Sequence, residues 1–411
     1  MPDDTRESGL NHPFANRPLR ALFVQSTAEV GGAEVALVTM LQNLDRAAVE
    51  PFVTFLGFGD GPLPDDVERL GIPVFRFPRG RFRNVASTTG KIRALRALIR
   101  KHSIDVVVSN GGHANLFARP AAKLTRRPCA WWVHMYDEST RLEGRKAIAR
   151  AERMLSADVL YANSEFTAAR LMQDFPDGPQ IRVVRPGVDL ERFRPDPQAG
   201  ARVRQEEGIP AGQPVIGIFG RLQRGKGQHV FLRAAALLAG RGLSFTAIVV
   251  GGSLFGLEPE YAKELEHLAA ATSLNGKVHF LGNRSNPQDW MNACDVVVLS
   301  SIEPESWGLV AAEAMACGRA VLASAAGGPL EMIDHKRTGW LTAPGDEVAM
   351  AAWLEILLAN PVLRAELGEA ARRHAELEFD PRRAASVLSM ELWRLWAARI
   401  DSMQLLTEPV P

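Results

Sequence analysis

The sequence contains few cysteines and few tyrosines, and its net charge is close to zero. The 411 residues include three cysteines and three tyrosines, and Lys plus Arg exceed Asp plus Glu by one, 48 against 47. Cys129, Cys294 and Cys317 form no CxxC pair, so they favour a reducing compartment over a disulfide framework. A net charge of +1 provides no overall attraction to nucleic acid or to a membrane. Any charged partner must therefore be recognised by a local patch.

Long apolar runs and targeting signals are also missing. No apolar stretch approaches the ~18 residues that a membrane-spanning helix needs. No basic segment followed by an apolar one opens the chain, so we expect no signal peptide. Residues 1–18 are polar and proline-containing, and we expect them to form a flexible tail. Together these absences predict a cytoplasmic protein.

What is present is a regular alternation of short apolar runs with segments of helical period. This alternation predicts βαβ units, and therefore an α/β fold built on parallel sheets. Two such series are joined by the proline-rich segment 185–197. We expect Rossmann-like, doubly wound domains over 19–190 and 191–380, facing each other across a cleft. The expected strands are 20–26, 52–57, 73–77, 105–109, 129–133 and 158–164 in the first domain, and 214–220, 244–250, 277–282, 295–301, 319–324 and 338–343 in the second.

The last segment, 384–403, has the period of an amphipathic helix. A large apolar residue recurs every four positions, at Leu388, Leu392, Trp396 and Ile400. We expect residues 381–411 to carry this helix back onto the first domain, where its apolar stripe would be buried.

The segment FGRLQRGKG, 219–227, predicts a phosphate site. It follows an expected strand, and its glycines allow the backbone to approach a ligand closely. The helix start beyond it offers free N–H donors, and Arg221 and Lys226 supply two positive charges that suit a diphosphate. The alternative is that both cations are solvated in an ordinary loop between a strand and a helix.

Two glutamates eight residues apart stand in SSIEPESWGLVAAEAMACGRAVLAS, 300–324. Glu305 precedes an apolar helix that begins near Gly308, and Glu313 lies about two turns into it. Carboxylates accept paired hydrogen bonds from vicinal hydroxyls, such as those of sugar and ribose rings. The alternative is that Glu305 only favours the helix dipole while Glu313 faces solvent.

The first domain offers glycines and histidines at the ends of its expected strands. Gly31 and Gly32 follow the first strand and allow a tight turn, although the GxGxxG fingerprint of dinucleotide sites is not met. His134 ends an apolar strand at the edge of the sheet where the cleft is expected, and His113 competes for the same role. The alternative for either histidine is a structural role.

Residues 71–104 hold nine basic residues and no acidic ones, with Phe75, Phe77, Phe82 and Ile92 interleaved. This composition suits an anionic membrane surface, at ~1 kcal/mol per basic residue, on the inner face of the cytoplasmic membrane. The alternative is a solvated basic face. No nucleic-acid-binding motif accompanies the stretch, so we expect no nucleic-acid partner. The nine residues are Arg76, Arg79, Arg81, Arg83, Lys91, Arg93, Arg96, Arg100 and Lys101.

In their order along the chain, these motifs resemble the family 4 retaining glycosyltransferases, which have the GT-B fold. The resemblance spans residues 20 to about 380. It includes GGAE, the phosphate loop and the E-x7-E pattern of Glu305 and Glu313. Four further segments match: ANSEFTAARL (162–171), RPGVDLERF (185–193), HFLGNRSNPQDWMNACDVVVLSS (279–301) and GGPLEMIDHKRTGWLTAPGD (327–346).

The resemblance implies a role for each matched residue. Arg221 and Lys226 would hold the donor diphosphate and stabilise the leaving group. Glu305 would bind the donor sugar, and Glu313 would bind the ribose. His134 would lie in the active site near the donor sugar. The remaining donor contacts would come from Gly32, Asn283, Arg284, Gly308, Leu309 and Val310, and the acceptor would enter near Gly31 and His113.

The implied reaction moves a hexosyl group, with retention, from a nucleotide-sugar to a saccharide or lipid-linked acceptor, in surface polysaccharide or glycolipid synthesis. Folds that bind the donor diphosphate through a metal carry an Asp-x-Asp motif, which this sequence does not contain. We therefore expect metal-independent catalysis and no cofactor. Trp307 stands where the family often has Phe or Tyr, so we expect a differently shaped sugar pocket. Two alternatives stay open: a GT-B-fold sugar-nucleotide epimerase and a non-catalytic sugar-nucleotide-binding protein.

Overall fold

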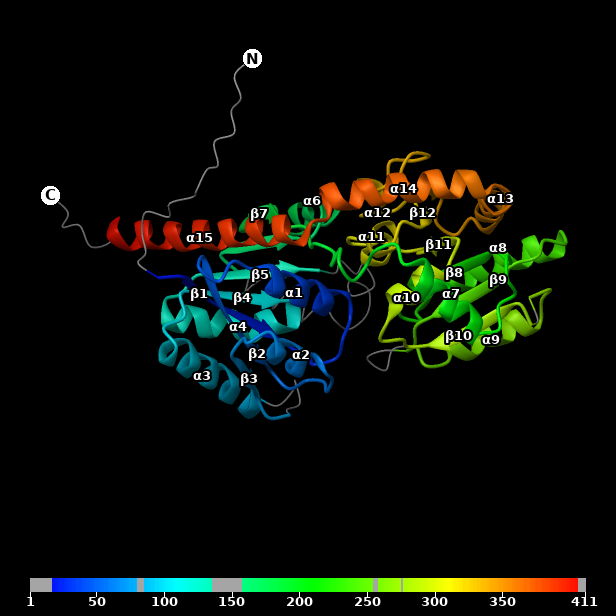
Figure 1. Cartoon of the computed structure of the whole chain (residues 1–411). Coiled ribbons are helices and arrows are strands. Elements are labelled where there is room, and N and C mark those ends of the chain that lie inside the picture. Colours follow the sequence, from blue (N-terminus) through cyan, green and yellow to red (C-terminus); the bar gives the residue numbers. More distant parts are fainter. Residues whose placement is uncertain (1–16, 80–84, 135–156, 254–257, 275, 406–411) are drawn as a thin grey trace, which may run out of the picture.

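The computed structural model describes residues 17–79, 85–134, 157–253, 258–274 and 276–405. These residues form two α/β domains that lie side by side (Figure 1). Each domain is built on one sheet whose paired strands all run parallel. The expected architecture, two Rossmann-like domains each built on a parallel sheet, is confirmed.

The first sheet has seven strands in the order β3-β2-β1-β4-β5-β6-β7. Its central strands are mostly apolar and almost wholly buried, as expected when helices cover both faces. The strands are β1 (Leu19–Gln25), β2 (Val49–Phe55), β3 (Val74–Arg76), β4 (Val106–Asn110), β5 (Cys129–Val133), β6 (Val159–Ala162) and β7 (Gln180–Val183). The helices are α1 (Gly32–Asn43), α2 (Leu63–Arg69), α3 (Val85–Lys101), α4 (Gly112–Thr125) and α6 (Glu165–Asp174).

The second sheet has six strands in the order β10-β9-β8-β11-β12-β13. The strands are β8 (Val215–Phe219), β9 (Thr246–Val250), β10 (Val278–Gly282), β11 (Val296–Leu299), β12 (Ala320–Ser324) and β13 (Trp340–Thr342). The helices are α7 (Pro197–Glu206), α8 (Gln228–Gly240), α9 (Tyr261–Ala270), α10 (Pro287–Ala293), α11 (Leu309–Ala316), α12 (Pro329–Met332), α13 (Glu347–Ala359) and α14 (Pro361–Glu378).

The last helix, α15 (Pro381–Leu405), returns to the first domain. Figure 1 shows α14 lying over the second domain and α15 continuing over the first. Leu388, Leu392 and Trp393 are buried in the same core as β1 and β2, and Trp393 Nε1 donates to Ala48 O at 3.1 Å. Leu388 and Leu392 of the predicted stripe therefore pack on the first domain as expected, and Trp396 is partly buried against the same core, whereas Ile400 is not part of it.

The chain crosses between the domains twice, and the two crossings touch. Val188 N donates to Phe379 O at 2.9 Å. A Cβ built on Gly187 would stand 2.3 Å from Pro381 Cα, so only glycine allows this approach. The two crossing segments therefore move together.

The basic stretch 71–104 is not one continuous basic face. Arg76 and Arg79 pair with acidic residues of the same domain. Lys91 is buried and donates to two backbone carbonyls at 2.6 and 2.7 Å. The interleaved Phe75, Phe77 and Ile92 pack against the core. The exposed cations of α3 are Arg93, Arg100 and Lys101, while Arg81, Phe82 and Arg83 lie outside the described residues.

Among the described residues, no single helix is both long and apolar enough to cross a membrane. One pair of segments passes that test only together, Glu347–Ala359 with Pro361–Asp401, and it bends by 103° at the break. Cys129, Cys294 and Cys317 are all free and buried, as expected for small core residues.

Candidate active site

The loop between β8 and α8 carries both cations of the predicted phosphate site. Arg221 follows β8 at the carboxyl edge of the second sheet, and Lys226 ends a single 3-10 turn just before α8. Ser300, after β11, donates its hydroxyl to Gly227 O at 2.7 Å. Gly227 has a φ of +68°, and a Cβ there would stand 2.0 Å from Ser300 O. The loop is thereby packed against the segment that carries Glu305.

Lys226 and Glu305 form an ion pair between these two loops. Lys226 Nζ lies 2.7 and 2.8 Å from Oε1 and Oε2 of Glu305, and Ser301 Oγ donates to Oε1. Burial raises the pKa of Glu305, but the charge and hydrogen bonds of Lys226, helped by Ser301 and Arg221, outweigh burial. The pKa of Glu305 therefore lies below its ordinary value, and the group is ionised at neutral pH.

Glu313 lies inside the second domain on α11 and is only 7% exposed. Among the described residues, no side chain or backbone group donates a hydrogen bond to its carboxyl group. Burial raises its pKa to about 8, opposed only by the charge of Arg192. The alternative of a solvated surface glutamate is therefore wrong. Glu313 is a buried acceptor whose hydrogen bonds are not supplied by the described part of the chain.

The start of α11 lies between these two glutamates in the sequence. Gly308 caps the helix with a φ of +92°, and its carbonyl accepts from Ala311 N. Within the described residues, the backbone N–H groups of Leu309 and Val310 meet no acceptor. Free N–H groups and the positive end of the helix dipole together favour an anion at this point.

Arg221 also acts on a buried carboxyl group of the first domain. Glu34, on α1, is 8% exposed and accepts hydrogen bonds from Gly31 N at 3.1 Å and from Gln25 Nε2 at 3.2 Å. Burial raises the pKa of Glu34, while these hydrogen bonds and the charge of Arg221 oppose the rise. The sequence indicates this role of Glu34 by its position. Glu34 stands three residues after the helix cap Gly31, where a capping box has its glutamate. The phosphate loop therefore lies close enough to the first domain to influence it electrostatically.

His134 directly follows β5, at the carboxyl edge of the first sheet. Its Nε2 lies 2.6 Å from Oδ1 of Asn110, which ends β4. Asn110 Nδ2 donates to Ala33 O at 3.3 Å, so the amide oxygen faces His134 and Nε2 carries the proton. Burial lowers the pKa of His134 to about 3, so its imidazole is neutral at physiological pH.

The other first-domain candidates gather at the same edge, beyond the neighbouring strands β1 and β4. Gly31 caps α1, and Gly32 is its exposed first residue. A Cβ built on Gly32 would meet no atom within 4 Å, so packing within the protein does not require glycine there. His113 is exposed in the first turn of α4.

Asn283 and Arg284 follow β10 and lie at the same edge as the phosphate loop, with β9 between β10 and β8. The Asn283 side chain lies beside Gly252, where an added Cβ would stand 3.0 Å from Nδ2. The guanidinium of Arg284 lies over the ring of Trp290 at 5.1 Å. Both residues are exposed and stand two strands away from the two cations.

Trp307 does not line an open pocket. It is 5% exposed, belongs to the core of the second domain, and packs edge-on against Phe379 with ring centroids 5.8 Å apart. The Trp307 ring therefore packs into the core of the second domain beside the start of α11, and its effect on the shape of the sugar pocket stays a prediction.

Two cavities lie elsewhere. With volumes of about 240 and 200 Å³, they open near the amino ends of β5, β6 and β7 beside α15, away from the carboxyl-edge residues above. Over the described ranges, no group of three or more His, Cys, Asp or Glu side chains is placed to hold a metal ion.

Comparison with known proteins matches both domains to glycosyltransferases. Residues 201–374 match the family model described as glycosyl transferases group 1, and residues 30–192 match that of glycosyltransferase family 4. The D-inositol 3-phosphate glycosyltransferase of Streptomyces scabiei is 32% identical over 85% of this chain and 83% of its own length. That of Saccharomonospora viridis is 36% identical over 61% of this chain and 58% of its own length.

Solved structures agree with these matches. HepE of Anabaena in complex with UDP-glucose has a TM-score of 0.80 and 28% identity, covering 91% of this chain and 99% of that one. Sucrose-phosphate synthase from Thermosynechococcus elongatus shares the fold, with a TM-score of 0.77, 21% identity and coverage of 92% and 100%. With matches to both domains and 32% identity over most of its length, the chain belongs to the family 4 glycosyltransferases.

Proposed function

We propose that the chain transfers a hexosyl group from a nucleotide-sugar to an acceptor hydroxyl, with retention of anomeric configuration. The observation that carries the proposal is the cluster of Arg221, Lys226, Glu305 and Glu313 around the start of α11. One short region there combines two cations, free N–H groups and a buried carboxyl group without donors. These are the groups that a diphosphate and two sugar rings would require.

Arg221, Lys226 and the start of α11 would bind the diphosphate. As the glycosidic bond breaks, the departing nucleoside diphosphate gains negative charge, which fixed cations and N–H donors stabilise. The neutral imidazole of His134, opposite them in the first domain, would face the donor sugar. Because protein groups supply the positive charge, we propose that transfer needs neither a metal ion nor a cofactor.

The two glutamates would hold the two ends of the donor. Vicinal ribose hydroxyls would supply the hydrogen bonds that Glu313 lacks and would favour its ionised form. Glu305 is already ionised and would accept from hydroxyls of the transferred sugar. Asn283 and Arg284, two strands away, would border the base.

The nucleotide-sugar donor has support from a solved relative. HepE of Anabaena has been crystallised with UDP-glucose and with UDP and glucose, at 28% identity to this chain. The open space around Gly32 fits the same proposal, since a glycine that packing does not require leaves room for a ligand against the backbone. We propose UDP as the first base to test.

The acceptor would enter from the first domain, near Gly31 and His113. Relatives named for D-inositol 3-phosphate make a phosphorylated polyol one candidate, beside the saccharide or lipid-linked acceptors of surface polysaccharide and glycolipid synthesis. We propose a cytoplasmic reaction, with the exposed cations of α3 able to hold the protein at an anionic membrane.

The test begins with thermal shifts in UDP-, GDP- and ADP-sugars. We expect one nucleotide class to raise Tm, since a ligand that binds only the folded state stabilises it. That donor is then incubated with an acceptor panel in EDTA, and the product anomer is read by NMR. Retained transfer supports the proposal. Epimerised donor without acceptor would indicate an epimerase, and binding without turnover would indicate a binding protein.

A further inference from the structure

We infer that Glu331 is a positioning residue that fastens the second domain to the first and so sets the separation between Glu305 and His134. Its catalytic consequence rests on the proposed function, whereas the contact between the domains does not. Three sets of hydrogen bonds carry the inference, and none of them needs a ligand.

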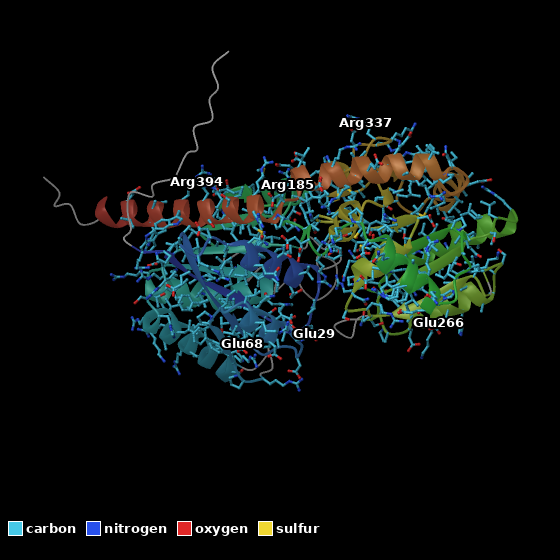
Figure 2. All side chains as sticks on the ribbon, in the orientation of Figure 1. Glu29, Glu68, Arg185, Glu266, Arg337 and Arg394 are labelled. Atoms are coloured by element: carbon cyan, nitrogen blue, oxygen red, sulfur yellow. The ribbon has the colours of Figure 1, made fainter. Side chains whose placement is uncertain are left out.

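Glu331, on α12 of the second domain, binds the start of α6 in the first domain. Oε1 accepts from Phe166 N at 2.6 Å, and Oε2 accepts from Glu165 N at 3.0 Å. These N–H groups belong to the first turn of α6 and have no partner within the helix. A carboxylate suits them because the helix start carries partial positive charge. Arg185 lies where the two domains meet (Figure 2). Its Nη2 is 3.4 Å from Oε2 of Glu331.

The same turn of α6 holds the backbone of His134. Asn163 Nδ2 donates to His134 O at 3.1 Å, and Thr167 Oγ1 donates to Asn163 Oδ1 at 2.8 Å. Asn163 is 3% exposed and Thr167 is fully buried. Buried hydrogen bonds of this kind resist rearrangement, because breaking one leaves polar groups unpaired away from water. A displacement of the start of α6 would therefore displace His134.

On the other side, the turn that leads into α12 is bonded to Glu305. Gly328 N donates to Glu305 O at 2.8 Å, and Glu305 N donates to Ala326 O at 3.3 Å. Gly327 has a φ of +72°, and a Cβ there would stand 2.0 Å from Glu305 O. The backbone of Glu305 and the start of α12 are therefore one packed unit.

Together these bonds form a bridge from Glu305 through Glu331 and α6 to His134. The main donor-binding candidates, Arg221, Lys226, Glu305 and Glu313, all lie in the second domain, on one side of the bridge. Loss of Glu331 should therefore leave donor binding nearly intact while letting the first domain drift. Drift of about 1 Å is enough to slow transfer on the order of 10- to 100-fold.

The first arm of the test measures geometry and needs no substrate. All three native cysteines are buried, so spin labels can be attached to cysteines introduced at two exposed positions, Leu124→Cys in the first domain and Val348→Cys in the second. Double electron–electron resonance on this doubly labelled protein should give a broader distance distribution in Glu331→Ala. Glu331→Gln keeps one acceptor oxygen and should broaden it less. Glu369→Gln removes an exposed carboxylate of α14 and should change nothing.

The second arm measures kinetics. In Glu331→Ala we expect kcat to fall on the order of 10- to 100-fold, while the donor Kd stays within about threefold. Thr167→Val removes the hydroxyl that donates to Asn163 Oδ1, accepts from Ser164 Oγ and lies 3.5 Å from Ser306 O of the second domain, so it should lower kcat and broaden the distance distribution less than Glu331→Ala does. If Glu331→Ala does not fold, Glu331→Gln and Thr167→Val decide the question.

An unchanged distance distribution in both Glu331 variants overturns the inference. A broadened distribution with wild-type kcat overturns the positioning role. If the wild-type protein transfers no sugar, the proposed function fails, and the distance arm alone decides whether Glu331 joins the domains.

Discussion

Lys226 Nζ lies 2.7 and 2.8 Å from the two carboxylate oxygens of Glu305, although 79 residues separate them in the sequence. In the proposed reaction, Lys226 faces a diphosphate and Glu305 faces a sugar. While the donor is absent, the ion pair therefore neutralises both charges. When the donor binds, hydrogen bonds between Lys226 and Glu305 must be replaced by hydrogen bonds to the donor.

Replacing either cation of the phosphate loop should slow transfer. We expect Arg221→Ala and Lys226→Ala each to lower kcat by ~10²-fold or more, because each removes charge that stabilises the leaving group. Steady-state kinetics with the donor identified by thermal shift would measure this. Lys263→Ala, which removes an exposed cation of α9, is the matched control and should behave as wild type. Near-wild-type turnover in either loop variant would contradict the assignment.

Gly32→Ala should weaken donor binding without lowering the stability of the protein. Its added methyl group meets open space, so we expect Tm to stay within about 1 °C of the wild-type value or to rise slightly. Donor affinity should fall about tenfold or more, because the methyl group would occupy the place of the ligand. Gly90→Ala, equally open on α3, controls for the change of glycine to alanine. Unchanged donor affinity in Gly32→Ala would leave Gly32 outside the site.

Glu313→Gln should be more stable than the wild type at alkaline pH. The pKa of Glu313 rises from an ordinary value near 4.5 to about 8 on folding, so the folded protein holds its proton more tightly. Stability is therefore lost as pH rises between these two values, by on the order of 3 kcal/mol at pH 7. Glutamine cannot ionise and avoids this loss.

The measurement for Glu313 is Tm against pH in the absence of ligand. The Tm difference between Glu313→Gln and the wild type should be largest near pH 8 and vanish near pH 4.5. The same variant should bind the donor more weakly, since it accepts with one oxygen only. A Tm difference independent of pH would show that Glu313 is not the group that titrates.

Asn110→Asp should raise the pKa of His134. Burial holds this pKa near 3 in the wild type, and a carboxylate 2.6 Å from Nε2 would favour the imidazolium. Titration of the His134 ring protons by NMR should show the increase, with His335, exposed in the second domain, as internal control. We also expect turnover to fall at the pH where His134 becomes charged. A His134 titration unchanged by the substitution would show that Asn110 does not govern it.

Binding to anionic vesicles should be weak and salt-sensitive. Three exposed cations remain on α3, so the triple variant Arg93→Glu, Arg100→Glu and Lys101→Glu should abolish sedimentation with phosphatidylserine vesicles. Lys263→Glu, which reverses one exposed charge in the second domain, is the control and should still sediment. If the wild-type protein does not sediment at low salt, the stretch is a solvated face.

Apolar periodicity predicted most of the architecture. Residues 129–133 coincide with β5, because a buried strand in a parallel sheet is apolar at every position. β7 went unpredicted because it is a half-exposed edge strand with Arg182 in its middle, which breaks the apolar run. The predicted helix at 384–403 corresponds to α15 because one apolar stripe runs along it.

The site was harder to predict from the sequence. Glycines and cations after β8 indicate a phosphate loop by composition, but nothing in their spacing indicates that Lys226 meets Glu305. Burial of Glu313 and of Trp307 depends on packing across the whole second domain, which local sequence does not show. Glu331 has no chemical signature in GGPLEMI, since its role depends on a helix start 165 residues away.

The position of α15 also has a consequence for synthesis. β1 and β2 are made early, yet their core includes Leu388 and Leu392, which are translated after the entire second domain. A nascent chain on the ribosome can complete the second domain before the first has its full apolar core. The first domain therefore matures last although it is made first, and a stop codon shortly after residue 380 would damage the domain at the opposite end of the gene.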